Sequence, residues 1–193
     1  MNLRSLALAV AATAAIAGTG PLVTGCAPLV VGAIGTGALV AADRRSTGAV
    51  VDDEGIELKV RNASLRYGSD LHLSVTSYNG VVLLSGEAPS QDVINDLVNF
   101  ARTTARVRKV ENEMTVGPVA SLGSRSNDTL ITSKVKARFV EANRFAPVHV
   151  KVVTERGVVY LFGLVSRDEA QAATEIAAAT SGVQRVVRLF EYV

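Results

Sequence analysis

Apolar and polar residues alternate along two pairs of short segments in this chain, one pair within 71–84 and the other within 148–161. A period of two is typical of β-strands that bury one face. Asn79-Gly80 and Arg156-Gly157 divide the pairs and predict tight hairpin turns, because glycine tolerates a positive φ. The positions expected to face a core are Leu71, Leu73, Val75, Val82, Leu84, Val148, Val150, Val152, Val159 and Leu161.

Amphipathic helical patterns precede and follow each predicted hairpin. Ser90 after Pro89, and Ser166 with Glu169 three residues on, have the spacing of helix N-caps. The order is therefore αββαβ, twice, which predicts an α+β fold with two domains, each a three-stranded mixed sheet packed by two helices. The expected helices are 54–65, 90–104, 128–142 and 166–180, and the closing strands are 107–116 and 183–192.

The two halves are copies of one module. Residues 80–86 and 157–163 both have the pattern G-x-V-x-L-x-G at an offset of 77. Lys59-Val60 and Lys134-Val135 match upstream at an offset of 75, so short insertions in loops separate the copies. Only a pair is present, which predicts two small domains and no solenoid.

The N-terminus has the pattern of an exported, acylated protein. An apolar run at 6–17 is shorter than the ~20 residues of a membrane span and fits a signal peptide. Leu22-Val23-Thr24-Gly25-Cys26 then resembles a bacterial lipobox, so we expect cleavage before Cys26 and acylation of its thiol. The alternative is an ordinary cysteine after a secretory signal. Ala27 in place of Asp favours the outer membrane under the sorting rule for such lipoproteins.

Cleavage would leave a lipid anchor joined to the two modules. Residues 27–42 are uncharged and apolar, and three glycines weaken any helix there, so we expect a tether near the bilayer or against the folded body. The predicted divisions are a signal peptide at 1–25, a lipidated N-terminus and tether at 26–50, a first domain at 51–116, a linker at 117–126 and a second domain at 127–193.

The repeated pattern resembles a known family. G-x-V-x-L-x-G after an alternating strand, followed by a helix and Gly182-Val183-Gln184-Arg185-Val186, resembles the BON domain; the first copy has Arg106 where the second has Gly182. Two such copies behind a lipobox resemble the DolP family of outer-membrane lipoproteins with two BON domains. That resemblance implies association with anionic phospholipid, support of envelope integrity and a link to cell-division sites.

Candidate catalytic and metal-binding residues are few. His72 and His149 occupy equivalent repeat positions between inward-facing residues, so we interpret them as surface strand histidines duplicated with the module. Asp52-Asp53-Glu54 is interpreted as a charge complement to a helix N-terminus. No His, Cys and carboxylate cluster or nucleotide-binding glycine loop is found, so we expect no enzyme activity, cofactor, metal or small-molecule substrate.

Charge differs between the halves. Residues 43–116 hold 9 Lys/Arg and 11 Asp/Glu, net −2, whereas residues 117–193 hold 10 and 7, net +3. The near-neutral total argues against a nucleic-acid partner. The second half is the better candidate for an anionic partner.

A candidate lipid-binding surface lies on the opening helix of the second copy. We expect Leu130, Ile131, Lys134 and Arg138 to bind anionic phospholipid, namely phosphatidylglycerol or cardiolipin, with Leu130 inserted and the cations at phosphates. The simpler interpretation is that Leu130 borders the core and the cations only solvate the helix. A rival function is a protein-interaction scaffold for outer-membrane assembly or peptidoglycan-remodelling machinery.

The lipobox generates one test. Cys26→Ala removes the thiol that would carry the acyl chains, so the protein should be released into the soluble fraction or retained with its signal peptide. Membrane fractionation with immunoblotting measures this. Unchanged recovery of Cys26→Ala with the outer membrane would show that another segment is the anchor.

Overall fold

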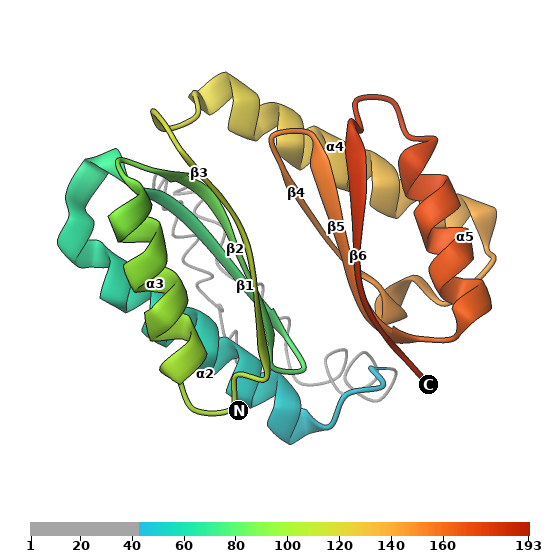
Figure 1. The fold of residues 1–193 in the computed structure, drawn as a ribbon. Helices are drawn as coiled ribbons and strands as arrows, with labels where there is room; N and C mark the ends of the chain where they lie inside the picture. Colours follow the sequence, from blue (N-terminus) through green and yellow to red (C-terminus); the bar gives the residue numbers. More distant parts are fainter. Residues whose placement is uncertain (1–42) are drawn as a thin grey trace, which may run out of the picture.

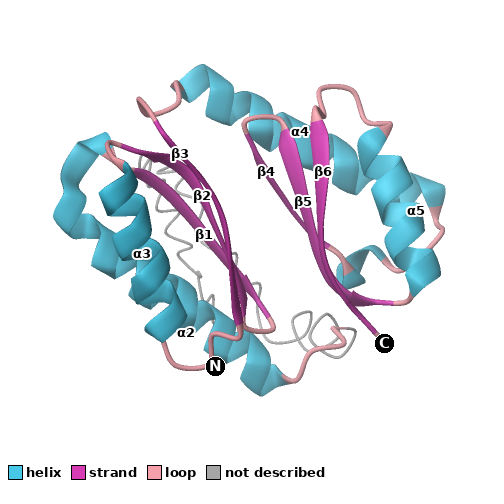
Figure 2. Cartoon of the chain, viewed as in Figure 1, coloured by secondary structure: helices cyan, strands magenta, loops and turns pink. Residues whose placement is uncertain are grey.

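The computed structural model describes residues 43–193 (Figure 1). The predicted signal peptide, Cys26 and the apolar segment 27–42 lie outside the described residues. The described chain forms two modules of the same topology, as the repeat predicted. Their sheets lie next to each other, and the helices form the two outer layers (Figures 1 and 2).

Each module contains a sheet of three strands with the hairpin and crossover that the sequence predicted. The first and second strands are antiparallel, and the second and third are parallel. Parallel neighbours need a crossover, which the intervening helix supplies. The first module has α2 (Thr47–Ser64), the 3₁₀ segment η1 (Leu65–Asp70), β1 (His72–Tyr78), β2 (Val81–Ala88), α3 (Gln91–Thr103) and β3 (Lys109–Val116). The second has α4 (Leu122–Ala142), the 3₁₀ turn η2 (Pro147–His149), β4 (Lys151–Glu155), β5 (Val158–Val165), α5 (Arg167–Ala178) and β6 (Arg185–Tyr192).

The predicted turns and caps are confirmed. Asn79 and Gly80 have φ of 51° and 76°, and Arg156 and Gly157 have 51° and 75°. Two consecutive positive φ values are those of the type I′ turn, whose twist matches that of the strands. The Ser90 side chain accepts a hydrogen bond from the Val93 amide, and Ser166 and Glu169 form a complete capping box.

The opening helices begin earlier than predicted. Ser46 and Ser121 are their N-caps, so α2 starts at Thr47 and α4 at Leu122, inside the predicted linker. The glycine-containing first turns concealed these starts because they lack an apolar period. The interpretation of Asp52-Asp53-Glu54 as an N-terminal charge complement is wrong, because Asp53 lies in the second turn and is buried.

One hydrophobic core lies between the helices and the sheet in each module. Val82, Leu84, Val159 and Leu161 are fully buried, as predicted, whereas Val148, which was also expected to face a core, is 40% exposed in the turn η2. Ile131, Val135 and Phe139 of α4 pack into the second core. Ala142, at the end of α4, is exposed.

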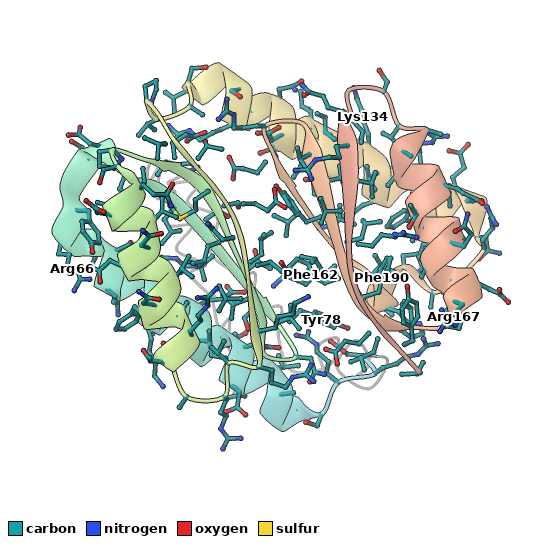
Figure 3. The ribbon with its side chains drawn as sticks, in the orientation of Figure 1. Arg66, Tyr78, Lys134, Phe162, Arg167 and Phe190 are labelled. Atoms are coloured by element: carbon teal, nitrogen blue, oxygen red, sulfur yellow. The ribbon has the colours of Figure 1, made fainter. Side chains whose placement is uncertain are left out.

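A third core lies between the two sheets, and the sequence did not predict it. Tyr78, Leu83, Tyr160 and Phe162 are buried there from opposite sheets. The rings of Tyr78 and Phe162 are 6.2 Å apart (Figure 3). The molecule is therefore a four-layer sandwich with two inner sheets and two outer helical layers.

This packing corrects the interpretation of the histidines. The sheet face of His72 is covered by the second module, and its side chain is 22% exposed, with Nε2 3.7 Å from Glu155 Oε1. His149 belongs to the turn η2 and not to a strand, and its Nδ1 lies 3.6 Å from Glu169 Oε1. Neither is a fully exposed strand residue.

A buried aspartate joins the opening helix to the hairpin in each module. Asp128 on α4 accepts hydrogen bonds of 2.8 Å from the amides of Arg156 and Gly157. Asp53 on α2 accepts from the equivalent amides of Asn79 and Gly80, at 2.6 and 2.9 Å. A carboxylate thus satisfies the two amides that the turn leaves without strand partners.

The contact at Asp128 can be tested by its removal. Asp128→Ala should lower the free energy of unfolding by about 2–3 kcal/mol, because two buried amides lose a charged acceptor. Urea denaturation followed by circular dichroism measures the change. Asp70→Ala, at an exposed position in η1, is the control and should be near neutral. Equal effects of the two substitutions would contradict the role given to Asp128.

Candidate functional site

The predicted lipid-binding residues lie on α4, in an outer layer of the sandwich. Leu130 is 59% exposed. Lys134, four residues further along α4, is exposed too (Figure 3). Ile131 is only 1% exposed and packs in the core, so it is removed from the predicted set. One residue turns a helix by 100°, which is enough to bring Ile131 from the outer face to the inner one.

Arg138 has a structural contact that the sequence did not indicate. Its guanidinium donates to the carbonyl of Ala179 and, at 3.1 Å, to the hydroxyl of Thr180. Those groups follow the end of α5, where carbonyls lack helical partners. Arg138 therefore joins α4 to the end of α5, and its side chain is only partly exposed to solvent.

Other side chains extend the surface of α4. Lys136 and Ala137 are exposed on the helix, and so is Val140, at 66%. Within residues 43–193, none of the cations of α4 lies within 4.0 Å of a carboxylate oxygen. The helix thus presents aliphatic side chains together with positive charges that have no acidic partner in the described chain.

The equivalent helix of the first module also has an apolar stripe. Val51 and Leu58 on α2, and Leu65 directly after it at the start of η1, are 63%, 55% and 73% exposed and are spaced by seven residues. These residues were not predicted from the sequence, although a repeat of seven could have indicated that they share one helix face. The helices α2 and α4 belong to opposite outer layers (Figure 2), so their exposed faces point away from each other.

A groove runs along the side of α4 that faces the first module. Its volume is about 490 Å³. Its walls combine hydroxyls, two unpaired cations and two buried carboxyl groups. The lining residues are His72, Ser74, Arg125, Asp128, Thr129, Thr132, Ser133, Lys136, Val152, Val153, Thr154 and Glu155.

Glu155 is the perturbed carboxyl group of this groove. Burial raises its pKa to about 7, and the negative charges of Asp128 and Glu87 act in the same direction against Arg125 and Arg156. Glu87 comes from the first module and is 1% exposed, with Oε2 3.1 Å from the amide of Ala120. The junction between the modules therefore contains a carboxyl group, that of Glu155, that resists ionisation.

The residues that directly follow the predicted tether contact both modules. Arg44 forms two hydrogen bonds with Glu169, at 2.6 and 3.0 Å, and this contact lowers the pKa of Glu169 to about 2. Arg45 binds Asp53 at 2.9 Å and lies over the ring of Tyr78. The chain thus enters the fold at the junction between the modules.

No cluster of three or more His, Cys, Asp or Glu side chains in residues 43–193 is placed to hold a metal. In the same residues, none of the helices combines the length and apolar character needed to cross a bilayer. The chemistry that the described surface offers is contact with a partner through exposed aliphatic groups, cations and hydroxyls.

Comparisons with known proteins agree with this architecture. A family model described as BON domain matches residues 52–118 and 127–193. The chain is 38% identical over 171 residues to the outer membrane lipoprotein DolP of Haemophilus influenzae, covering 87% of this chain and 89% of that one. It is 35% identical to the 21 kDa hemolysin of Actinobacillus pleuropneumoniae, covering 78% and 79%. It is also 32% identical to the osmotically-inducible protein Y of Escherichia coli, covering 78% and 77%.

The raised pKa of Glu155 predicts a pH-dependent stability. Between the ordinary pKa of 4.5 and about 7, the folded protein keeps a proton that the unfolded chain releases. Stability contributed by this proton is complete below that window and is lost as pH rises through it. Glu155→Gln cannot ionise, so its melting temperature should exceed that of the unaltered protein at pH 8, with the difference decreasing towards pH 4.5.

Thermal melts monitored by circular dichroism between pH 4.5 and 8 measure this difference. Glu141→Gln, at an exposed position of α4, is the control for loss of a surface carboxylate. A difference for Glu155→Gln that stays constant across the range would contradict the assignment.

Proposed function

The chain belongs to the BON-domain family, and from this premise we propose that it is a non-enzymatic lipoprotein of the outer membrane whose second module binds anionic phospholipid through α4. The anchor would be the acylated Cys26, with the modules facing the periplasm. On the family resemblance we extend the proposal to support of envelope integrity, including at division sites.

The exposed leucine beside unpaired cations supports this proposal most directly. Leu130 is 59% exposed, and Lys134 and Lys136 have no carboxylate partner within residues 43–193. An aliphatic group that enters the acyl boundary, with ammonium groups at phosphate level, is the arrangement of helices that lie on anionic membranes. Because Arg138 also supports the end of α5, Lys134 and Lys136 carry more of the proposed lipid contact than the sequence analysis assigned to them.

The magnitudes predict weak binding by the helix alone. A cation near an anionic surface contributes about 1 kcal/mol, and full insertion of a leucine side chain contributes ~1–2 kcal/mol. Salt screens the electrostatic part, since the Debye length is about 10 Å at 0.1 M ionic strength. The lipid anchor compensates by raising the local concentration of α4 at the membrane.

The length of the tether permits this contact. Residues 27–42 comprise 16 residues, which extend to at most about 58 Å. Asp43 follows directly and is held at the junction of the modules through Arg45. The two-layer width of one module is smaller than this reach, because stacked layers lie about 10 Å apart. The anchored protein can therefore rotate until α4 meets the bilayer.

Charge reversal on α4 tests the proposal. In the non-acylated mature chain carrying Cys26→Ser, Lys134→Glu should weaken binding to phosphatidylglycerol vesicles by about thirtyfold, because it changes the local charge by two units. Co-sedimentation at low salt measures this. Phosphatidylcholine vesicles should not bind, and added salt should release the protein.

Lys59→Glu is the matched control, because Lys59 is the repeat equivalent of Lys134 on α2. It should leave vesicle binding unchanged. In cells, a deletion strain should be sensitive to detergent and vancomycin, and Lys134→Glu should restore resistance less well than Lys59→Glu. Equal vesicle binding by both variants would overturn the assignment of α4.

The apolar stripe of α2 favours a second candidate function, binding of a partner protein. Val51, Leu58 and Leu65 are exposed on the layer opposite α4, so they face away from a membrane that α4 contacts. Their spacing of seven residues suits an amphipathic helix of a partner. If Leu58→Ser abolishes envelope function while vesicle binding persists, this scaffold function holds beside the lipid contact.

A further inference from the structure

The outer face of α2 has the residue pattern of one helix of a coiled coil. Exposed aliphatic side chains recur there every seven residues, and a small or polar residue lies three positions before each of them (Figure 2). We propose that this heptad face pairs with the same face of a second copy of the chain, with the two helices antiparallel. The inference rests on the protein-binding function proposed for α2 and names the partner. The heptad face comprises Gly48, Val51, Gly55, Leu58, Asn62 and Leu65.

Gly55 is the residue of this face that the fold of one copy does not require. It lies in the middle of α2, and a Cβ built on it would meet nothing within 4 Å. Glycine destabilises a helix interior relative to alanine, so a larger residue at this position would stabilise a single copy. What a glycine permits is the close approach of another backbone or side chain. The notch between Val51 and Leu58 therefore fits a side chain that comes from outside the chain.

One antiparallel register places every aliphatic side chain of the face on a small or polar residue of the second copy. Residue numbers rise along one helix as they fall along the other, so one facing pair determines the rest. Each leucine then enters a hole left by a glycine, and Asn62 is the single polar core residue of the kind that fixes register. Leu65 takes part because it keeps helical φ and ψ, −58° and −24°, directly after α2. The facing pairs are Leu58 with Gly55, Leu65 with Gly48, and Val51 with Asn62.

The charged residues that border the face are complementary in this same register. Glu54 and Arg61 lie on one side of Leu58, and Asp52 and Lys59 lie on the other, at 100° per residue. In the antiparallel pair, Glu54 lies beside Arg61 of the second copy. Asp52 likewise lies beside Lys59 of the second copy, and two-fold symmetry repeats both contacts. All four contacts join opposite charges.

A parallel arrangement lacks both features. With two parallel helices in register, Gly55 would face Gly55 and leave a void in the core of the pair. Arg61 would lie beside Arg66 of the second copy, and like charges at flanking positions oppose pairing. The heptad face is therefore complementary to itself only when the helices are antiparallel.

The bordering charges are available for such contacts. Glu54 and Lys59 have no oppositely charged group within 4.0 Å among residues 43–193. Arg61 has a 3.7 Å contact with Glu57 of its own helix, and Asp52 binds Arg106 at 2.9 Å. Pairs between such exposed side chains contribute little to stability, so these two can exchange for contacts with a second copy.

The size of the contact predicts weak pairing in dilute solution. The 18 residues of α2 form a helix about 27 Å long. A contact along one helix of this length buries less than the ~1,600 Å² of a standard interface. The lipid anchor proposed at Cys26 holds all copies at one surface and raises their local concentration. Pairing should therefore depend on how densely the protein covers the membrane.

The equivalent face of the second module does not have this pattern. At the offset of 75, Val51, Gly55 and Leu58 correspond to Ser126, Leu130 and Ser133. The notch is filled, and two of the aliphatic side chains are replaced by hydroxyls. Self-pairing is thus assigned to the first module alone.

Exchange of charges tests the pairing. The mature chain carrying Cys26→Ser is studied by sedimentation at low salt, at concentrations up to about 1 mM, and dimer should increase with concentration. Arg61→Glu should weaken association about tenfold, because Glu54 of the second copy then meets a like charge. Glu54→Arg should do the same. Glu54→Arg combined with Arg61→Glu should restore the association of the unaltered protein. Arg188→Glu, at an exposed position of β6, is the control and should have no effect.

Disulfide formation tests the direction of the helices. Cys26 is the only cysteine of the chain, so Val51→Cys and Asn62→Cys can each be introduced as a single cysteine in the Cys26→Ser background. In the proposed register the two positions face each other, whereas like positions lie about 16 Å apart along the helix axis. A mixture of the two variants should therefore form the mixed disulfide faster than either same-residue disulfide.

The outcomes separate self-pairing from the proposed binding function. A monomer at every concentration, or no recovery in the doubly exchanged variant, overturns self-pairing. If Leu58→Ser still abolishes envelope function in that case, a different protein is the partner of α2 and the binding function stands. Preferred same-residue disulfides overturn the antiparallel arrangement. Self-association together with full envelope function of Leu58→Ser supports the pairing and removes the scaffold function.

Discussion

The position of each opening helix depends on one buried carboxylate. Asp53 and Asp128 bind the two amides at the tip of the neighbouring hairpin, so the helix cannot rotate or slide without leaving those amides unpaired. For α4 this contact decides which residues point outward. Leu130 is two residues beyond Asp128, or about 200° around the helix, and therefore faces solvent when Asp128 faces the sheet. The contact also places Asp128 in the wall of the groove beside α4.

Contact between the two sheets determines how the modules divide their roles. Tyr78 and Leu83 meet Tyr160 and Phe162, and ion pairs such as Lys151 with Glu57, at 3.2 Å, border this core. Because the sheets face each other, all four helices lie outside. A flat bilayer can then meet the outer layer of only one module. This geometry supports α4 as the helix that contacts the membrane and the stripe of α2 as the surface that contacts a protein partner.

The turns, the helix caps and the topology could be predicted from the sequence, because they depend on neighbouring residues or on comparison of the two copies. Asn79-Gly80 and the Ser166–Glu169 capping box act within a few residues, and comparison of two copies made the topology plain. The sheet-to-sheet core could not be predicted, because Tyr78 corresponds to Glu155 at the repeat offset and the two copies bury different residues there. The early start of α4 was missed because its first turn is polar. Ile131 was misplaced because one position on a helix changes the face.

The differences between the two copies indicate that each module has its own role. Residues that maintain the fold are kept in both, as Asp53 and Asp128 are, and Ile56 and Ile131 are each buried in their own core. Residues beside them on the helices differ: Val50 and Leu58 in the first copy correspond to Arg125 and Ser133 in the second. These substitutions leave the core intact. They exchange an aliphatic face for a cationic and hydroxylated one, and the needs of folding do not explain that exchange. A difference in what each helix contacts does explain them, and an anchored protein with two outer layers has two different surroundings to meet.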